Sequence, residues 1–280
     1  MTRRLSAWIG TLLGPLLLVP LAAAAGAGDG GSEAVDSLLR GLASDRCETR
    51  LESRFNYFKS VEKEAAQTAA LKRRVKTLDA PLRARVGMIL ELMEERARGR
   101  ARTQALMKQA GQVQGAGDKA KQAAALDRLR QRLLRVIHDP KEAFNARLNA
   151  PWLLVRVSGF GLEFDPDWGK ELPRLLESPD LGVRLVGALT AADGRFPKGS
   201  DPPKSVVIRV LIDGLQSDSV AARDFARRGL LDVLRMIPEG LCFDPTDPLE
   251  GRAEAIRRWE AWWTANQEQL SRETIPQIFW

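Results

Sequence analysis

One spaced pattern occurs three times in this 280-residue chain and constrains its fold more than any other feature. It consists of a Leu, any residue, a Ser, five residues, an Arg, two residues and a small residue, and its two later copies are 39 residues apart. The Leu closes a first helix, the Ser caps a second helix, and the small residue lets the two helices pack closely. The pattern therefore predicts stacked helix pairs. Its arginines are Arg50, Arg184 and Arg223.

These arginines have two possible roles. They could line a groove and bind acidic ligands, or they could make a ladder of contacts to carboxylates or carbonyls of the turns. Their recurrence at one repeat position favours the structural role.

A second motif, Gly-Leu-x-Phe-Asp-Pro, occurs at 161–166 and again at 240–245, about two repeat units later. Its aspartates, Asp165 and Asp244, could in principle pair as a general acid and base. Phe-Asp-Pro is typical of a turn, so turn formation is the better interpretation. A degenerate copy of the repeat is expected at 139–160, where Asp139-Pro140 has the pattern of a helix start.

The period near 39, the two helices per unit, the turn Ser or Asp and the Arg with its small residue together resemble the HEAT and HEAT-like repeat family. The resemblance covers 38–55 and 172–230, is weaker at 139–160 and does not extend over 59–137. The closing run, with Phe243-Asp244-Pro245 and several Trp, resembles the ends of uncharacterised exported bacterial HEAT-repeat proteins. The resemblance implies an all-α, right-handed α-solenoid that serves as a binding scaffold, and it transfers no catalytic residue.

The N-terminus has the pattern of an export signal over residues 1–25: two arginines, an apolar run and four alanines. Residues 26–35 are then expected to form a flexible leader. An uncleaved membrane anchor is the alternative, although Pro15 and Pro20 disfavour a spanning helix. We expect a periplasmic or extracellular protein that meets a membrane only if the signal stays uncleaved.

Positive charge is concentrated in one segment. Residues 59–135 carry 19 Lys or Arg and 8 Asp or Glu, whereas the whole chain has a net charge of +7. Such a segment could contact lipid headgroups, an acidic polymer or, as the weaker candidate in an exported protein, nucleic acid. Interspersed glutamates fit a solvated helix face instead. The candidate contacts are Lys72, Arg73, Arg74, Lys76, Arg96, Arg98, Arg100 and Arg102.

The expected organisation after the leader has four parts: a first repeat and extended helix at 36–80, an inserted basic helical hairpin at 81–138, HEAT-like repeats with a Trp-rich capping helix at 139–266, and a C-terminal tail at 267–280. In the capping helix Trp259 and Trp263 share one face. Helical spacing favours a core plug at the end of the stack over a ligand cage.

No phosphate-binding glycine loop, HExxH or calcium-loop spacing occurs in the sequence. Its one histidine, His138, fits a helix C-terminus, and one His with two Cys cannot assemble a zinc site. Cys47 and Cys242 are expected to be buried free thiols, because distant repeats of a solenoid lie far apart; a mutual disulfide is the alternative. We therefore expect no cofactor or metal, and a non-enzymatic scaffold that binds protein through the solenoid groove. The alternative is an electrostatic binder of an anionic surface.

Overall fold

The structure is a computed structural model, and it describes residues 30–59, 64–114, 118–158, 168–194 and 201–275. Regular structure in these ranges is helical apart from an isolated antiparallel bridge between Pro203 and Thr274, which confirms the all-α class. The expected export signal at 1–25, the first copy of the Phe-Asp-Pro motif and the last five residues of the expected tail, 276–280, lie outside the described residues, whereas the first four residues of that tail, 267–270, belong to the last helix. The helices are α1 (Gly30–Leu42), α2 (Cys47–Phe58), α3 (Glu64–Arg74), the 3₁₀ helix η2 (Val75–Thr77), α4 (Ala80–Gln114), α5 (Lys119–His138), α6 (Phe144–Ser158), α7 (Trp168–Leu176), α8 (Leu181–Ala192), α9 (Lys204–Gly214), α10 (Val220–Leu234) and α11 (Leu249–Leu270).

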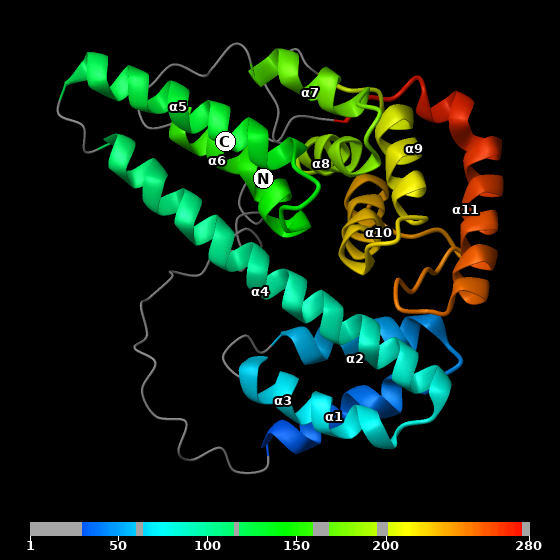
Figure 1. The fold of residues 1–280 in the computed structure, drawn as a ribbon. Coiled ribbons are helices and arrows are strands. Elements are labelled where there is room, and N and C mark those ends of the chain that lie inside the picture. Colours follow the sequence, from blue (N-terminus) through cyan, green and yellow to red (C-terminus); the bar gives the residue numbers. More distant parts are fainter. Residues whose placement is uncertain (1–29, 60–63, 115–117, 159–167, 195–200, 276–280) are drawn as a thin grey trace, which may run out of the picture.

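Helix α4 is the long element that joins two parts of the molecule (Figure 1). At one end it packs on α1 and α3, and at the other on α5 and α6. Its apolar residues accordingly enter two separate buried clusters. Val86, Ile89 and Met93 pack with apolar residues of α1, α2 and α3, whereas Leu92 and Leu106 belong to the main core.

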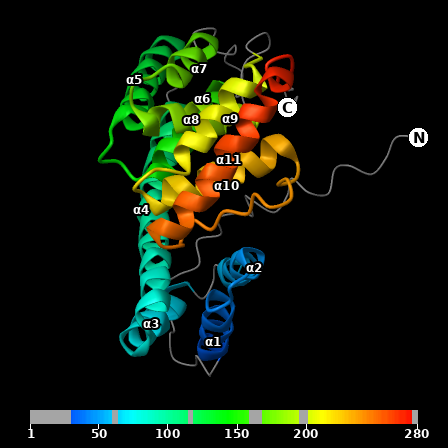
Figure 2. The same ribbon diagram turned by 90° about the vertical axis from the view of Figure 1, so that its right-hand side faces the viewer.

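We call α1, α2, α3 and the first turns of α4 the N-terminal lobe, and α5 to α11 with the rest of α4 the main lobe. Figure 2 shows the helices of the N-terminal lobe gathered at the lower end of α4. The segment expected as a projecting hairpin consists of α4 and α5. Both helices contribute fully or nearly fully buried leucines to the main core: Leu92, Leu106, Leu129 and Leu133. The hairpin helices thus contribute to the main core through these residues.

Two local expectations are wrong. Helix α1 begins at Gly30, so the second half of the expected leader is helical. Helix α6 begins at Phe144 rather than at Pro140, because Asp139 closes a turn by accepting from the backbone N–H of Lys141 at 2.9 Å. The first N–H of α6, that of Phe144, instead donates to the carboxylate of Glu95 on α4. A side chain from another helix therefore caps α6.

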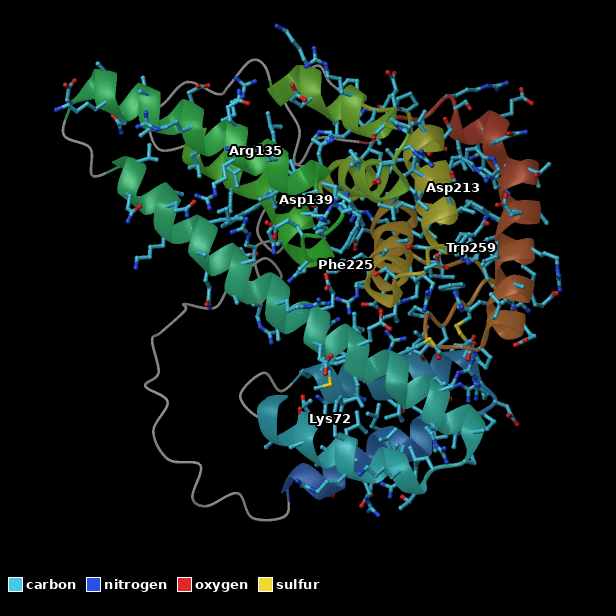
Figure 3. All side chains as sticks on the ribbon, viewed as in Figure 1. Lys72, Arg135, Asp139, Asp213, Phe225 and Trp259 are labelled. Carbon is cyan, nitrogen blue, oxygen red and sulfur yellow. A yellow bond between two sulfur atoms is a disulfide. The ribbon has the colours of Figure 1, made fainter. Side chains whose placement is uncertain are left out.

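Close packing in the main lobe depends on the small residues of the repeat. A Cβ added at Gly187, the small residue of the second copy, would lie 2.9 Å from the side chain of Leu175. Such a distance forces a shift, so glycine permits the approach of α7 to α8. On the far side of the stack, α11 lies along α9 and places Trp259 fully inside the core (Figure 3). Trp262 and Trp263 are half-buried against the same core.

Candidate functional site

The three repeat arginines make the same local contact. Each donates through one terminal nitrogen to two carbonyls, those of the residues six and five positions before it. These carbonyls sit in the turn between the paired helices and need hydrogen-bond donors as partners. The arginines therefore brace the turns from inside. The carbonyl pairs are Ser44 and Asp45, Ser178 and Pro179, and Ser217 and Asp218, at distances of 2.7–3.1 Å.

Arg50 differs from Arg184 because it also reaches across the molecule. Its Nε donates to Asp244 at 3.0 Å and its second terminal nitrogen to Asp247 at 2.7 Å. Asp244 forms the turn that its Phe-Asp-Pro motif predicts, since it accepts from the backbone N–H and the hydroxyl of Thr246. It is also almost fully buried and paired with Arg54 at 2.8 Å. The interpretation of Asp244 as a turn former alone is therefore incomplete.

Asp224 of α10 is the most deeply buried carboxylate of this cluster. It has no exposed surface and accepts from Arg54 at 2.6 Å, Arg228 at 2.8 Å and Arg96 at 3.4 Å. Burial alone would raise its pKa, but the positive charges, that of Arg54 first, outweigh burial and lower the pKa of Asp224 to about 2. The carboxylate is thus ionised at neutral pH.

Together these residues form what we call the joint: Arg50 and Arg54 of α2, Arg85 and Arg96 of α4, Asp224 and Arg228 of α10, and Asp244 and Asp247 of the following loop. Burial and the charge of Asp244 raise the pKa of Asp247, which pairs with Arg50 and Arg85. The joint ties the N-terminal lobe to the far end of the chain.

A disulfide lies beside the joint. Cys47, the first residue of α2, is bonded to Cys242, with 6.1 Å between their Cα atoms. The expectation of two free thiols is wrong. It assumed that the first helix pair lies at the far end of an extended stack, whereas the long α4 lets the N-terminal lobe fold back against the loop that follows α10.

The candidate basic contacts are mostly engaged within the chain. Lys72 pairs with Glu94 at 2.8 Å, Arg74 with Asp36 at 2.7 Å and Arg98 with Glu95 at 3.0 Å.

Two less exposed members of the set, Arg96 and Arg102, also have partners within the chain. Arg96 contacts Asp224 and lies over the ring of Phe58, 4.3 Å from its centroid, and Arg102 pairs with Glu142. Arg73, Lys76 and Arg100 are exposed. The basic segment is also divided between the lobes, as the distant positions of Lys72 and Arg135 in Figure 3 show.

A half-open pocket of about 370 Å³ adjoins the disulfide. One wall is α2, and the opposite wall is the loop that leaves α10. Arg235, with φ of 66°, ends α10, and Gly240, with φ of 78°, turns the loop back so that the N–H of Leu241 donates to Pro238 at 3.1 Å. The lining residues are Glu48, Leu51, Arg227, Ile237, Pro238, Glu239, Gly240, Leu241, Cys242, Phe243 and Trp259.

Two large apolar side chains are exposed next to this pocket. Phe55 lies one helical turn beyond Leu51 on α2 and is 67% exposed, and Met236 directly precedes the lining residue Ile237 and is 72% exposed. Residues i and i+4 of a helix lie on one face, so Phe55 extends the apolar lining outward. Sequence reasoning missed this pocket, because its two walls are far apart in the chain: Cys47 and Cys242, which connect them, have a sequence separation of 195.

No family model, curated protein or solved structure matches the chain. Among the described residues, no group of three or more His, Cys, Asp or Glu side chains is placed to hold a metal ion. A search of the same residues for a helix with the length and apolar character needed to cross a membrane found none.

Proposed function

We propose that this protein is a non-enzymatic scaffold that binds another protein at the pocket between α2 and the loop following α10. The observation that carries the proposal is the continuity of a half-open apolar pocket with two large exposed apolar side chains, Phe55 and Met236. Exposed apolar surface around a concave site is typical of binding surfaces in folded proteins.

The walls of the pocket are held in place before any partner arrives. Cys47 and Cys242 connect them covalently, and Arg50 pairs with Asp244 and Asp247 directly behind. A preformed site costs less conformational entropy on binding than a mobile one. The buried charges of the joint also face each other rather than the pocket, which supports a structural role for them and not a catalytic one.

For the architecture, we propose that α1/α2, α7/α8 and α9/α10 are HEAT-like helix pairs of a right-handed solenoid that is interrupted between the first pair and the later ones. The shared contact of Arg50, Arg184 and Arg223 with the turn carbonyls supports this assignment. So does the close approach at Gly187, the small residue of the pattern.

We also propose that the protein works outside the cytoplasm. The export pattern at residues 1–25 supports this location, and a disulfide that is maintained needs an oxidising compartment.

Affinity capture with matched surface variants tests the proposed function. The wild-type protein, the F55S/M236S double variant and a V206S control would each be incubated with an envelope extract over a salt series. Val206 is also exposed but lies on α9, away from the pocket. We expect one partner that the wild type and V206S retain at high salt and that F55S/M236S loses.

Two outcomes would contradict the proposal. Equal capture by all three proteins would show that the pocket is not the binding site. Capture that disappears steeply with salt, and that is insensitive to F55S/M236S, would favour the exposed basic residues and an anionic surface.

A further inference from the structure

Arg227 is the one arginine of α10 without a hydrogen-bond acceptor among the residues that the structure describes. Arg223 donates to turn carbonyls and to Pro245, and Arg228 pairs with Asp224 at 2.8 Å. Within the described part of the chain, the Arg227 side chain has neither a hydrogen-bond partner nor an ion-pair partner, and its Nε is buried. Arg227 is also one of the residues that line the pocket described above.

The surroundings of Arg227 explain why it has no hydrogen-bond or ion-pair partner among the residues that the structure describes. Asp224, the carboxylate that interacts most strongly with its charge, is already shared by Arg54, Arg96 and Arg228. Burial is the main factor that lowers the pKa of the Arg227 guanidinium; the charge of Asp224 opposes this shift, whereas the charges of Arg54 and Arg228 add to it. A desolvated cation without an acceptor destabilises a fold, so an anion that enters the pocket would relieve this cost.

We propose that the pocket accepts the C-terminal residue of a partner polypeptide, with the terminal carboxylate on Arg227 and an apolar side chain on Leu51 and the loop. This inference rests on the proposed function and names the partner chemistry of the same site. A guanidinium binds a carboxylate with two parallel N–H donors, which gives both affinity and orientation.

The composition of the lining fits the C-terminal residue of a polypeptide. Besides Arg227, most of the lining is apolar, and the terminal residue of a chain joins a carboxylate and an apolar side chain at one Cα atom. Because the pocket is open on one side and Phe55 and Met236 continue the apolar surface outside it, the occupant extends beyond the pocket. Glu48 and Glu239, two exposed acidic residues of the lining, disfavour ligands with several negative charges.

Calorimetric titration of the purified, oxidised protein with short peptides tests the proposal. The probe is acetyl-Gly-Gly-Leu with a free carboxylate. Its controls are the C-terminal amide, acetyl-Gly-Gly-Gly with a free carboxylate, and 4-methylpentanoate, which carries the same two groups without a peptide. We expect binding by the first probe and an affinity lower by about tenfold or more for each control, as for the loss of one buried charged or apolar contact.

Two arginine variants locate the carboxylate. R227M is expected to lose at least about tenfold in affinity for the peptide, whereas R257M is expected to bind like the wild type. Arg257 is an exposed arginine of α11 that pairs with Glu254. Thermal unfolding of the free proteins separates binding from folding: R227M should melt at the wild-type temperature or above it, because it removes a buried charge without an acceptor.

Several results would overturn the chain-end assignment: equal binding of the acid and the amide, equal binding of 4-methylpentanoate and the peptide, no binding of any probe, or a marked fall in the melting temperature of R227M. These failures are distinguishable from failure of the proposed function. If F55S/M236S still loses a captured partner, the pocket is a protein-binding site with another chemistry.

Discussion

The stack of α7 to α10 and the joint between α2 and the loop after α10 are stabilised in different ways. In the stack, neighbouring helices bury apolar side chains such as Leu185 and Leu211, and the arginine that braces each turn lies within six residues of its acceptors. At the joint, Arg54 meets Asp224 across 170 residues and Arg50 meets Asp244 across 194. Charges and a disulfide therefore connect the lobes there.

The difference has an energetic consequence. Apolar burial stabilises a stack in proportion to the area removed from water, and the loss of one contact is local. Buried charges are stabilising only as a complete set, because removing one partner leaves the others desolvated. We therefore expect the stack to tolerate small changes and the joint to respond sharply to the loss of a single carboxylate.

Truncation of the core tryptophan measures how much apolar burial contributes to the free energy of unfolding. Trp259 is fully buried, and its indole N–H has no partner within the described part of the chain, so packing accounts for its contribution. We expect W259A to lower the free energy of unfolding by about 3–5 kcal/mol. Urea unfolding followed by circular dichroism checks this value, and a change below about 1 kcal/mol would show that Trp259 is not a core residue.

Removal of the Asp224 carboxylate measures how much the buried charges of the joint contribute to stability. D224A leaves Arg54, Arg96 and Arg228 without their shared acceptor, and we expect a loss of about 3–5 kcal/mol in the same urea experiment. The control is D213A, which removes a half-buried partner of Arg209 on α9 and should cost about 1 kcal/mol or less. Similar losses in the two variants would contradict the importance of the joint.

Removal of the disulfide tests whether the joint needs its covalent tie. C47S/C242S opens a loop of sequence separation 195, and we expect a loss of about 2–5 kcal/mol. Hydrogen exchange should become faster in α1 to α3 and stay slow in α8 to α10. Uniform acceleration in both lobes would mean that the bond supports the whole fold rather than the attachment of the N-terminal lobe.

Acid should loosen the joint before the stack. The pKa of Asp224 is lowered to about 2 from an ordinary value of 3.8, so its contribution is complete above pH 4 and is lost as the pH falls towards 2. This shift corresponds to about 2 kcal/mol. The pKa of Asp244 is also lowered, despite burial, by Arg54 and its hydrogen bonds, and it acts in the same direction.

Asp247 acts in the opposite direction, because its raised pKa makes the folded protein bind a proton first as the pH falls towards 4. Unfolding free energies measured between pH 6 and pH 2.5 should therefore fall most steeply below pH 4. In D224N that decline should be weaker, and an unchanged decline would assign the acid sensitivity to other groups.

The sequence predicted the local part of this structure and missed the long-range part. The spacing of Ser and Arg predicted the turn contacts, because each arginine lies within six residues of the carbonyls to which it donates. Neither Arg54 nor Asp224 belongs to a repeated position, and nothing in the local pattern around Cys47 and Cys242 indicates that they meet. The sequence also did not predict the full length of α4, because Glu95 and Gly99 interrupt the row of apolar residues along that helix. In the fold Glu95 caps α6, and Gly99 allows close contact with Asn145.

The smallest effect is expected from two copies of the same contact, the one between a repeat arginine and the carbonyls of its turn. Arg184 is half-buried and donates only to Ser178 and Pro179, so in R184M water can solvate the released carbonyls and the loss should be about 1 kcal/mol. Arg223 is 2% exposed and also donates through two nitrogens to Pro245, so R223M leaves buried acceptors unpaired and should cost about 2–3 kcal/mol. Urea unfolding of the two variants gives both values. Equal losses would show that the turn contact alone sets the contribution of these arginines, and that the additional bond from Arg223 to the loop does not couple the stack to the joint.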